Sequence, residues 1–403
     1  MSLPISSRIR HTALLAALAA AAVLSACGGG GSADAGASAS TVTPTAFTQG
    51  TITGFGSIMV NGVRFDESAA TITDDAGNAS SAQALRLGMR VEVDHASVDA
   101  SASTARAAAV RYGSLVLGPV ASVNVAGNTL TVLGQVVDVT ASTVFSDTLA
   151  AGLSAVAAGA VIEVHGLVDA ATGHISATRV EAASSAAHYK LRGTVAGLNS
   201  TAKTFNIGAA AISYATLPST AVPATLANGL ALRVELATAQ SAGFWVASAL
   251  GVKGLHTDHA NGLGGQVRGK ITAFTSASSF TVDGVVVDAS AASFTDGSSG
   301  LALGVEVEVD GSVSNGVLVA TKVALENRHQ GDDSHQWQLF GAISALDAAA
   351  KTFVVRDVIV SYGAATRYVG GTVADLALGR KVHVKGTVGS TRSQVQAAVV
   401  SFE

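Results

Sequence analysis

The sequence predicts an all-β protein made of small antiparallel β-barrels in tandem, and three observations lead to that prediction. One pattern of glycine and aliphatic residues returns five times in 403 residues. Each copy contains short runs in which apolar and polar residues alternate, the period of a half-buried strand. Hairpin turn signals separate the runs. We expect OB-like barrels of five to six strands each. Small β-sandwich modules are the alternative, although a sandwich usually needs about seven strands and about 100 residues.

Three anchors define each copy. It opens on Gly-x-Val or Gly-x-Ile, continues to a second glycine followed three and five residues later by aliphatic residues, and ends in Ala-x-x-Val or Ala-x-x-Leu. The opening glycines are Gly50, Gly118, Gly193, Gly269 and Gly341, and the second glycines are Gly88, Gly159, Gly229, Gly304 and Gly379. Successive opening glycines lie 68, 75, 76 and 72 residues apart, which is too long for a solenoid repeat and suits a small complete domain.

The strands can be followed most easily in the fourth copy. Residues 269–273 and 279–282 are the first two strands, and Asp283-Gly284 is a type I′ hairpin signal before the third strand. Residues 305–310 alternate valine with acidic residues, and residues 317–323 form the last strand. The corresponding hairpin signals elsewhere are Asn61-Gly62, Leu133-Gly134 and Arg356-Asp357. The second glycine is expected to mark a bulge or bend where the barrel closes.

The N-terminus predicts export. Residues 1–26 contain Arg8 and Arg10, then a short apolar run and small residues, which together are typical of a signal peptide. The sequence Leu24-Ser25-Ala26-Cys27 resembles the bacterial lipobox, which implies that Cys27, the single cysteine, is lipidated. An ordinary signal peptide with a chance cysteine is the alternative. Residues 28–46 are rich in Gly, Ser and Ala and predict a flexible tether that reaches roughly 25 Å.

The chain therefore divides into a leader, a tether and five modules. The predicted parts are a signal peptide (1–26), the lipidated cysteine with its tether (27–47), module 1 (48–112), module 2 (113–187), module 3 (188–254), a linker (255–264), module 4 (265–327), a linker (328–336) and module 5 (337–403). This organisation resembles a family of bacterial lipoproteins built from tandem repeats of a small β-barrel domain of unknown function. The resemblance implies a lipid-anchored location in the cell envelope, with the outer membrane favoured, and brings no activity with it.

Composition and motifs argue against several classes of function. The chain carries 24 Lys and Arg against 28 Asp and Glu, a net charge of −4, so it lacks the basic character of a nucleic-acid binder. The sequence has no nucleophile elbow, phosphate loop, dinucleotide fingerprint or His-Glu-x-x-His motif. We therefore expect neither an enzyme nor a cofactor.

Two linkers hold the residues most suggestive of metal binding. The candidate ligands are His256, Asp258, His259, His329, Asp332, Asp333 and His335. Imidazole nitrogens and carboxylate oxygens suit Zn²⁺ and related ions, but a solvated linker would also have this composition. Trp245 and Trp337 are candidate ligand-binding aromatics, with core packing as the favoured interpretation of both.

Polar residues on the fourth strand of each module are expected to face solvent. His165 and His383 lie at such outward positions, and Glu92, Glu163, Glu306 and Glu308 share the same face. Exposed charges of this kind protect a sheet from edge-to-edge aggregation.

The sequence as a whole predicts a non-enzymatic envelope lipoprotein that serves in binding, adhesion or structural support. Its expected partners are the membrane, through the lipid anchor, and an envelope protein or glycan. Two alternatives stay open. One is a periplasmic or surface enzyme acting on polysaccharide or peptide, and the other is a metal-dependent binding protein that uses the linker histidines.

Overall fold

The computed structural model describes residues 42–183, 186–252, 259–326 and 336–403. Residues Thr41–Glu403 form one compact unit. Within the described ranges, its regular structure is almost entirely β-strand, and short 3₁₀ turns make up the rest. The predicted all-β fold class is therefore confirmed.

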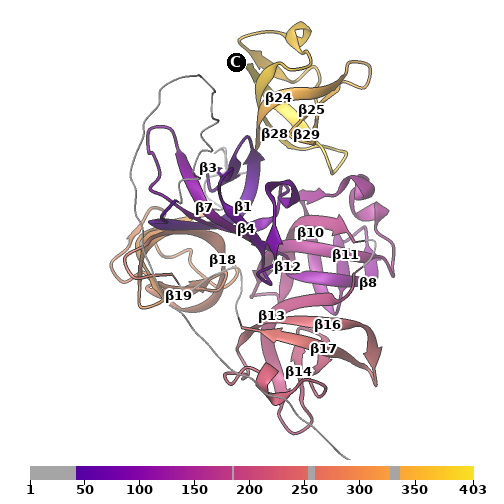
Figure 1. The fold of residues 1–403 in the computed structure, drawn as a ribbon, viewed down its shortest axis with the longest axis vertical. Coiled ribbons are helices and arrows are strands. Elements are labelled where there is room, and N and C mark those ends of the chain that lie inside the picture. The colour runs from indigo at the N-terminus through magenta and orange to yellow at the C-terminus, as the bar shows by residue number, and fades with distance from the viewer. Residues whose placement is uncertain (1–41, 184–185, 253–258, 327–335) are drawn as a thin grey trace, which may run out of the picture. The chain divides into compact units, whose positions relative to one another are not determined.

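Module 2 shows the barrel in its simplest form (Figure 1). Its strands are β8 (Val116–Asn124), β9 (Thr129–Val132), β10 (Gln135–Phe145), β11 (Val161–Asp169) and β12 (His174–Ala182), with the 3₁₀ turns η2 (Asp147–Leu149) and η3 (Gly152–Ala155) before β11. Strands β8, β9 and β10 pair antiparallel in sequence order. Strand β10 then pairs parallel with β12, which pairs antiparallel with β11, and β11 returns to β8. This closed five-stranded circuit is OB-like, and the sandwich alternative is wrong.

The same circuit closes the other four modules. Module 1 contains β1 (Ala46–Phe55), β2 (Ile58–Val60), β3 (Val63–Asp66), β4 (Thr71–Asp74), β5 (Ala79–Ser80), η1 (Ala82–Ala84), β6 (Arg90–His95) and β7 (Thr104–Gly113). Module 3 contains β13 (Tyr189–Asn199), β14 (Thr204–Ile207), β15 (Ala210–Ser213), η4 (Ser219–Ala221), β16 (Ala231–Ser241) and β17 (Phe244–Gly251). Module 4 contains β18 (Gly264–Ser276), β19 (Ser279–Val282), β20 (Val285–Asp288), β21 (Ser293–Phe294), β22 (Glu306–Ser314) and β23 (Val317–Leu325). Module 5 contains β24 (Trp337–Asp347), β25 (Thr352–Val355), β26 (Val358–Ser361), β27 (Arg367–Val369), η7 (Val373–Asp375), β28 (Lys381–Val388) and β29 (Val395–Phe402).

The predicted hairpin signals adopt the backbone that a type I′ turn requires. Both residues of each pair have positive φ: 50° and 80° at Asn61-Gly62, 46° and 74° at Leu133-Gly134, and 45° and 89° at Asp283-Gly284. Arg356 and Asp357 do the same at 52° and 61°. These turns match the right-handed twist of the strands that they join.

The second glycine of each module has a specific role in closing its barrel. All five of these glycines have φ between 79° and 89°, a left-handed conformation that favours glycine. In this conformation each backbone N–H donates to a carbonyl of the first strand: Gly88 to Ile52, Gly159 to Val120, Gly229 to Val195, Gly304 to Ile271 and Gly379 to Ile343, at 2.8–2.9 Å. The turn therefore brings the fourth strand onto the first strand.

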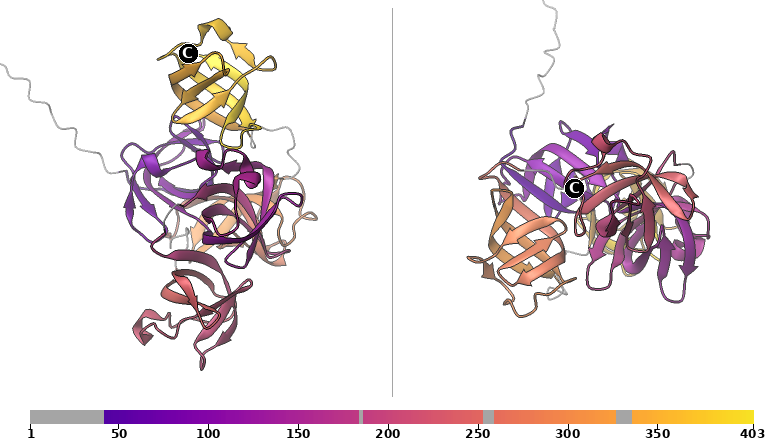
Figure 2. Two further views of the ribbon diagram at one scale, coloured as in Figure 1. Left: turned by 90° about the vertical axis from the view of Figure 1, so that its right-hand side faces the viewer. Right: turned by 90° about the horizontal axis from the view of Figure 1, so that it is seen from below.

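The interior of each barrel is filled by the alternating aliphatic residues and a few aromatic rings. Phe205, Phe280 and Phe353, on the second strands of modules 3, 4 and 5, are buried. The module 4 barrel is drawn in orange in Figure 2. Its core is formed by its own residues and Phe47. The buried residues of modules 2 and 3 form one continuous cluster, and those of modules 1 and 5 form another.

Strand pairing also crosses module boundaries. Strand β1 pairs parallel with β18 over Ala46–Gln49 and with β24 at Gly54 and Phe55. Strands β8 and β13 pair antiparallel at Leu117–Lys190 and Val116–Leu191. A small barrel buries a limited share of its surface, so contacts of this kind add to its stability.

Candidate functional site

One outward stripe of polar residues recurs on the fourth strand of every barrel. We use the name polar stripe for the residues four and six positions after the second glycine: Glu92 and Asp94, Glu163 and His165, Arg233 and Glu235, Glu308 and Asp310, and His383 and Lys385. Because side chains alternate along a strand, both members point away from their own core. In the structure each stripe is covered, to different extents, by other parts of the chain.

The expectation that this face is solvated is therefore wrong at two positions. Glu92 has no exposed surface and His165 is 1% exposed. Glu163, Glu306, Glu308 and His383 are half-buried. The reason is that the barrels pack through these faces, so a side chain that points out of one barrel meets a neighbouring segment. Lys190 of module 3, for example, lies with its Nζ 3.5 Å from Glu163 Oε1 of module 2.

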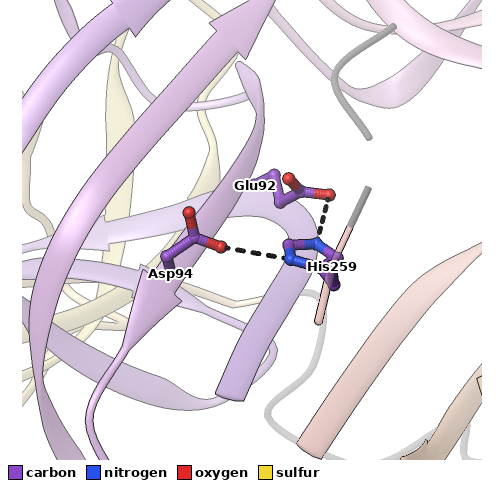
Figure 3. A group of neighbouring side chains, drawn as sticks. All are labelled: Glu92, Asp94 and His259. Carbon is purple, nitrogen blue, oxygen red and sulfur yellow. Dashed lines mark ion pairs between the residues drawn. The ribbon is translucent and has the colours of Figure 1, made fainter. Parts of the chain in front are cut away.

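The stripe of module 1 forms a cluster with His259, shown in Figure 3. The two ring nitrogens of His259 face different carboxylates, with Nε2 3.4 Å from Glu92 Oε2 and Nδ1 3.7 Å from Asp94 Oδ1. Arg111 bridges the same carboxylates at 2.8 and 2.9 Å. The imidazole also stacks on Phe47, with centroids 3.9 Å apart. The His259 ring therefore lies between the two carboxylates that Arg111 also contacts.

The stripe of module 2 forms a second cluster, made of Glu163 and His165 on β11 and Glu181 on β12. One ligand atom from each of the three residues lies within 4.8 Å of the others. His165 Nδ1 is 3.0 Å from the Gly113 carbonyl oxygen, while its buried Nε2 has no hydrogen-bond partner among the described residues. Lys190 Nζ lies 3.5 Å from Glu163 Oε1, and Arg179 pairs with Glu181 Oε1.

The charges in this second cluster are perturbed by burial. Burial lowers the pKa of His165, which favours its neutral form. Burial also acts to raise the pKa of Glu163, but nearby charges and hydrogen bonds, including those of Lys190, outweigh it, so the pKa of Glu163 lies below its usual value. The cluster therefore combines a neutral imidazole with an ionised Glu163 carboxylate.

A third buried histidine, His95, has both nitrogens satisfied. Its Nδ1 lies 2.6 Å from the Ala96 carbonyl oxygen and its Nε2 lies 3.0 Å from the Thr48 hydroxyl. Burial lowers its pKa as well. The Ala96 carbonyl accepts a hydrogen bond from Nδ1–H, and the Thr48 hydroxyl donates one to Nε2. His95 is therefore a structural residue.

A cavity of about 680 Å³ is lined by the described residues of four modules. Nine of its side chains carry hydroxyl or amide groups, and charged side chains of both signs join them. The lining residues are Thr51, Thr53, Met59, Asn61, Gly62, Arg90, Thr140, Ser142, Leu167, Ser176, Ala177, Thr178, Arg268, Lys270, Thr295, Gly304, Glu306, Glu308, Lys322, Ala324, Glu326, Trp337 and Gln338. They come from modules 1, 2, 4 and 5.

Most cations of the cavity already have partners. Arg90 pairs with Asp283 at 2.6 Å, and Lys270 pairs with Asp169 at 2.5 Å. Arg268 pairs with Glu326 at 2.6 Å and with Glu306 at 3.3 Å. The wall is therefore polar with little unbalanced charge.

Glu308 is the most perturbed titratable group in the cavity. Burial raises its pKa to about 7, and the nearby charges of Asp310 and Glu326 contribute in the same direction. A carboxyl group with such a pKa can be either a donor or an acceptor near neutral pH.

The two tryptophans differ in their surroundings. Trp337 is 5% exposed and packs in the shared core of modules 1 and 5, yet it also lines the cavity. Its indole Nε1 has no hydrogen-bond partner among the described residues. Trp245 is half-buried and packs edge-on against Tyr189 at 5.7 Å, away from the cavity lining.

Of the seven residues predicted from the linkers as metal ligands, only His259 lies among the described residues. His256, Asp258, His329, Asp332, Asp333 and His335 lie outside them, as does Cys27. His259 meets the module 1 stripe, more than 160 residues earlier in the sequence. Sequence reasoning assigned Glu92, Glu163 and His165 to a solvated face and did not single out Asp94, Glu181 or the cavity. His259 and Lys190, which lie near Glu92 and Glu163, come from other parts of the chain, and the pairing of Glu163 with Glu181 depends on the strand register.

The comparisons with known proteins extend this description. The model of a protein family described as a domain of unknown function, DUF5666, matches residues 49–106, 118–181, 268–324 and 340–400. Module 3 lies outside these segments although its strands form the same circuit. No curated protein matches the chain. A solved Drosophila structure titled "drosophila Unr CSD456" is 11% identical and covers 54% of this chain and 98% of its own, with a TM-score of 0.14. A likeness at that level supports no argument.

A search of the described residues for membrane-crossing helices found none with the necessary length and apolar character.

Proposed function

Because the chain belongs to the DUF5666 family, whose function is unknown, we propose a function from its own geometry: a non-enzymatic binding scaffold of the cell envelope that recognises a glycan. The cavity of about 680 Å³ is the observation on which this proposal rests. A volume of that size is ordinary for a small-molecule site.

The chemistry of the wall favours a neutral, polyhydroxylated ligand. Hydroxyl and amide groups can both donate to and accept from sugar hydroxyls. The ion pairs of Arg90, Arg268 and Lys270 leave little charge to select an anion or a cation. The indole N–H of Trp337, which has no hydrogen-bond partner within the described ranges, offers a donor at the edge of a core, where a ligand oxygen would satisfy it.

The five barrels support a scaffold role rather than catalysis. Their polar stripes hold different residues in different modules and take part in packing. Arg233, from the stripe of module 3, pairs with the Asp75 carboxylate of module 1, which also pairs with Lys190 and Arg192, at 2.8–3.3 Å. Repetition here builds a rigid frame around a cavity. A membrane anchor at Cys27, with the outer membrane as the favoured location, completes the proposal.

Glycan binding is tested by comparing two tryptophan variants of the full chain on a panel of envelope polysaccharide fragments. Trp337→Phe keeps an aromatic ring but removes the N–H, so we expect affinity to fall roughly 3- to 10-fold, the worth of one hydrogen bond. Trp245→Phe, outside the cavity lining, is the matched control and should bind as the parent does. Absence of binding to any glycan, or an equal effect of both variants, would contradict the proposal.

Anchoring is tested by metabolic labelling with a fatty acid. Thioether attachment needs the sulfur of Cys27, the single cysteine of the chain, so Cys27→Ser should abolish labelling and membrane fractionation. A labelled, membrane-bound Cys27→Ser protein would refute the anchor.

A further inference from the structure

We propose that Glu163, His165 and Glu181 form a binding site for a divalent transition-metal ion such as Zn²⁺ on the outer face of module 2. One imidazole nitrogen and two carboxylate groups provide ligands that suit such ions. This site uses none of the linker residues on which the sequence suggested a metal.

The orientation of the imidazole is the first argument. His165 Nδ1 lies 3.0 Å from the Gly113 carbonyl oxygen, which has no proton to give, so Nδ1 carries the proton and donates it. The lone pair is therefore on Nε2. Metal-binding histidines are typically held in this way, with the other ring nitrogen donating to a backbone carbonyl or carboxylate.

The unsatisfied state of Nε2 is the second argument. His165 is 1% exposed, and its Nε2 has no hydrogen-bond partner among the described residues. A buried acceptor left in that state costs about 1–3 kcal/mol. A metal ion between Nε2 and the neighbouring carboxylates would satisfy it.

The register of the β11–β12 ladder is the third argument. Glu163 lies directly opposite Glu181, and like charges in opposing positions repel each other. The residue opposite the same stripe position is Arg111 in module 1, Gly251 in module 3, Ala324 in module 4 and Ser401 in module 5. Module 2 alone among the five barrels opposes two carboxylates here.

The nearby cations leave room for a metal. Lys190 and Arg179 each contact an Oε1 atom, so the second oxygen of each glutamate remains available as a ligand. Lys190 is also shared with Asp75, 3.3 Å away. The glutamate side chains are 29% and 21% exposed, which gives an ion a route from solvent. The ligand atoms, within 4.8 Å of one another, need to approach by roughly 1 Å to reach Zn²⁺ bond lengths.

Titration calorimetry of the full chain with Zn²⁺ tests the site. Every sample carries Cys27→Ser, so that no thiol competes for the ion. We expect one ion per chain at this site and a loss of affinity of at least about tenfold in both His165→Gln and Glu181→Gln. Glu181 is partly exposed, so Glu181→Gln should fold even if His165→Gln does not. Visible absorption after Co²⁺ loading provides a spectroscopic readout, and the band should disappear in the same two variants.

His259→Gln is the matched control, because it removes the imidazole of the other histidine–carboxylate cluster. It should leave the Zn²⁺ affinity and the Co²⁺ spectrum unchanged. Two results would overturn the proposal: no Zn²⁺ binding by the parent chain, or binding that survives Glu181→Gln and is lost in His259→Gln or His329→Ala.

Discussion

The histidine–carboxylate clusters of modules 1 and 2 occupy the same face of their barrels but are partnered differently. In module 1 both nitrogens of His259 face carboxylates, and Arg111 bridges Glu92 and Asp94. In module 2 one nitrogen of His165 faces a carbonyl and the other has no partner in the described part of the chain, while two glutamates oppose each other. The first arrangement balances its charges with side chains, and the second leaves a ligand position to fill. The contacts of the imidazole nitrogens and carboxylates, rather than the residue types, therefore distinguish the ion-pair cluster from the proposed metal site.

The largest effect is expected from removing the internal cation of the module 1 cluster. Arg111→Gln leaves Glu92, which has no exposed surface, and Asp94 without their bridging charge, and should lower the free energy of unfolding by about 3–5 kcal/mol. Urea denaturation gives the measurement. Arg106→Gln, at an exposed position, should change stability by less than about 0.5 kcal/mol. Equal effects of the two variants would mean that the cluster does not depend on Arg111.

A smaller, pH-dependent effect is expected at Glu308 in the cavity. Its folded pKa of about 7 exceeds the ordinary value of 4.5, so the native state retains a proton between these pH values that the unfolded chain has lost. The free energy of unfolding therefore falls as pH rises through that window. Glu308→Gln should raise stability at pH 8 by up to about 3 kcal/mol and change it little at pH 4.5.

Denaturation of the Glu308→Gln variant across this pH range checks the sign. Asp147→Asn, at an exposed position, controls for the loss of one negative charge. A stabilisation that is independent of pH would argue against an ionisation of Glu308 in this window.

The smallest effect concerns the satisfied histidine of module 1. Thr48→Val removes the hydroxyl that donates to His95 Nε2 and leaves that buried nitrogen unpaired, which should cost about 1–2 kcal/mol of stability. Thr201→Val, at an exposed turn, should have almost no effect. If the Thr48 variant is as stable as the parent, an unpaired imidazole nitrogen does not lower the free energy of unfolding of this fold. The unpaired Nε2 of His165 would then be weaker support for a metal site.

The sequence predicted the barrels well because their determinants are local. The Asp283-Gly284 turn and the alternation over residues 305–310 fix strand and hairpin formation within one module. The sites depend on contacts between modules, which no local pattern encodes. His165 was expected to be exposed because its strand alternates correctly, and alternation says only that a side chain leaves its own core. Glu181 could be recognised only once the strand register was known, and Trp337, a candidate from the sequence, could be placed at the cavity only from the structure.

Nitrogen-15 spectra of the histidine rings, recorded with and without Zn²⁺, test the central claim most directly. We predict that His95 and His165 both show the neutral form protonated at Nδ1, and that Zn²⁺ shifts the Nε2 resonance of His165 alone of the two. An unshifted His165 resonance at saturating Zn²⁺, or a proton on its Nε2, would contradict the assignment of this nitrogen as a metal ligand.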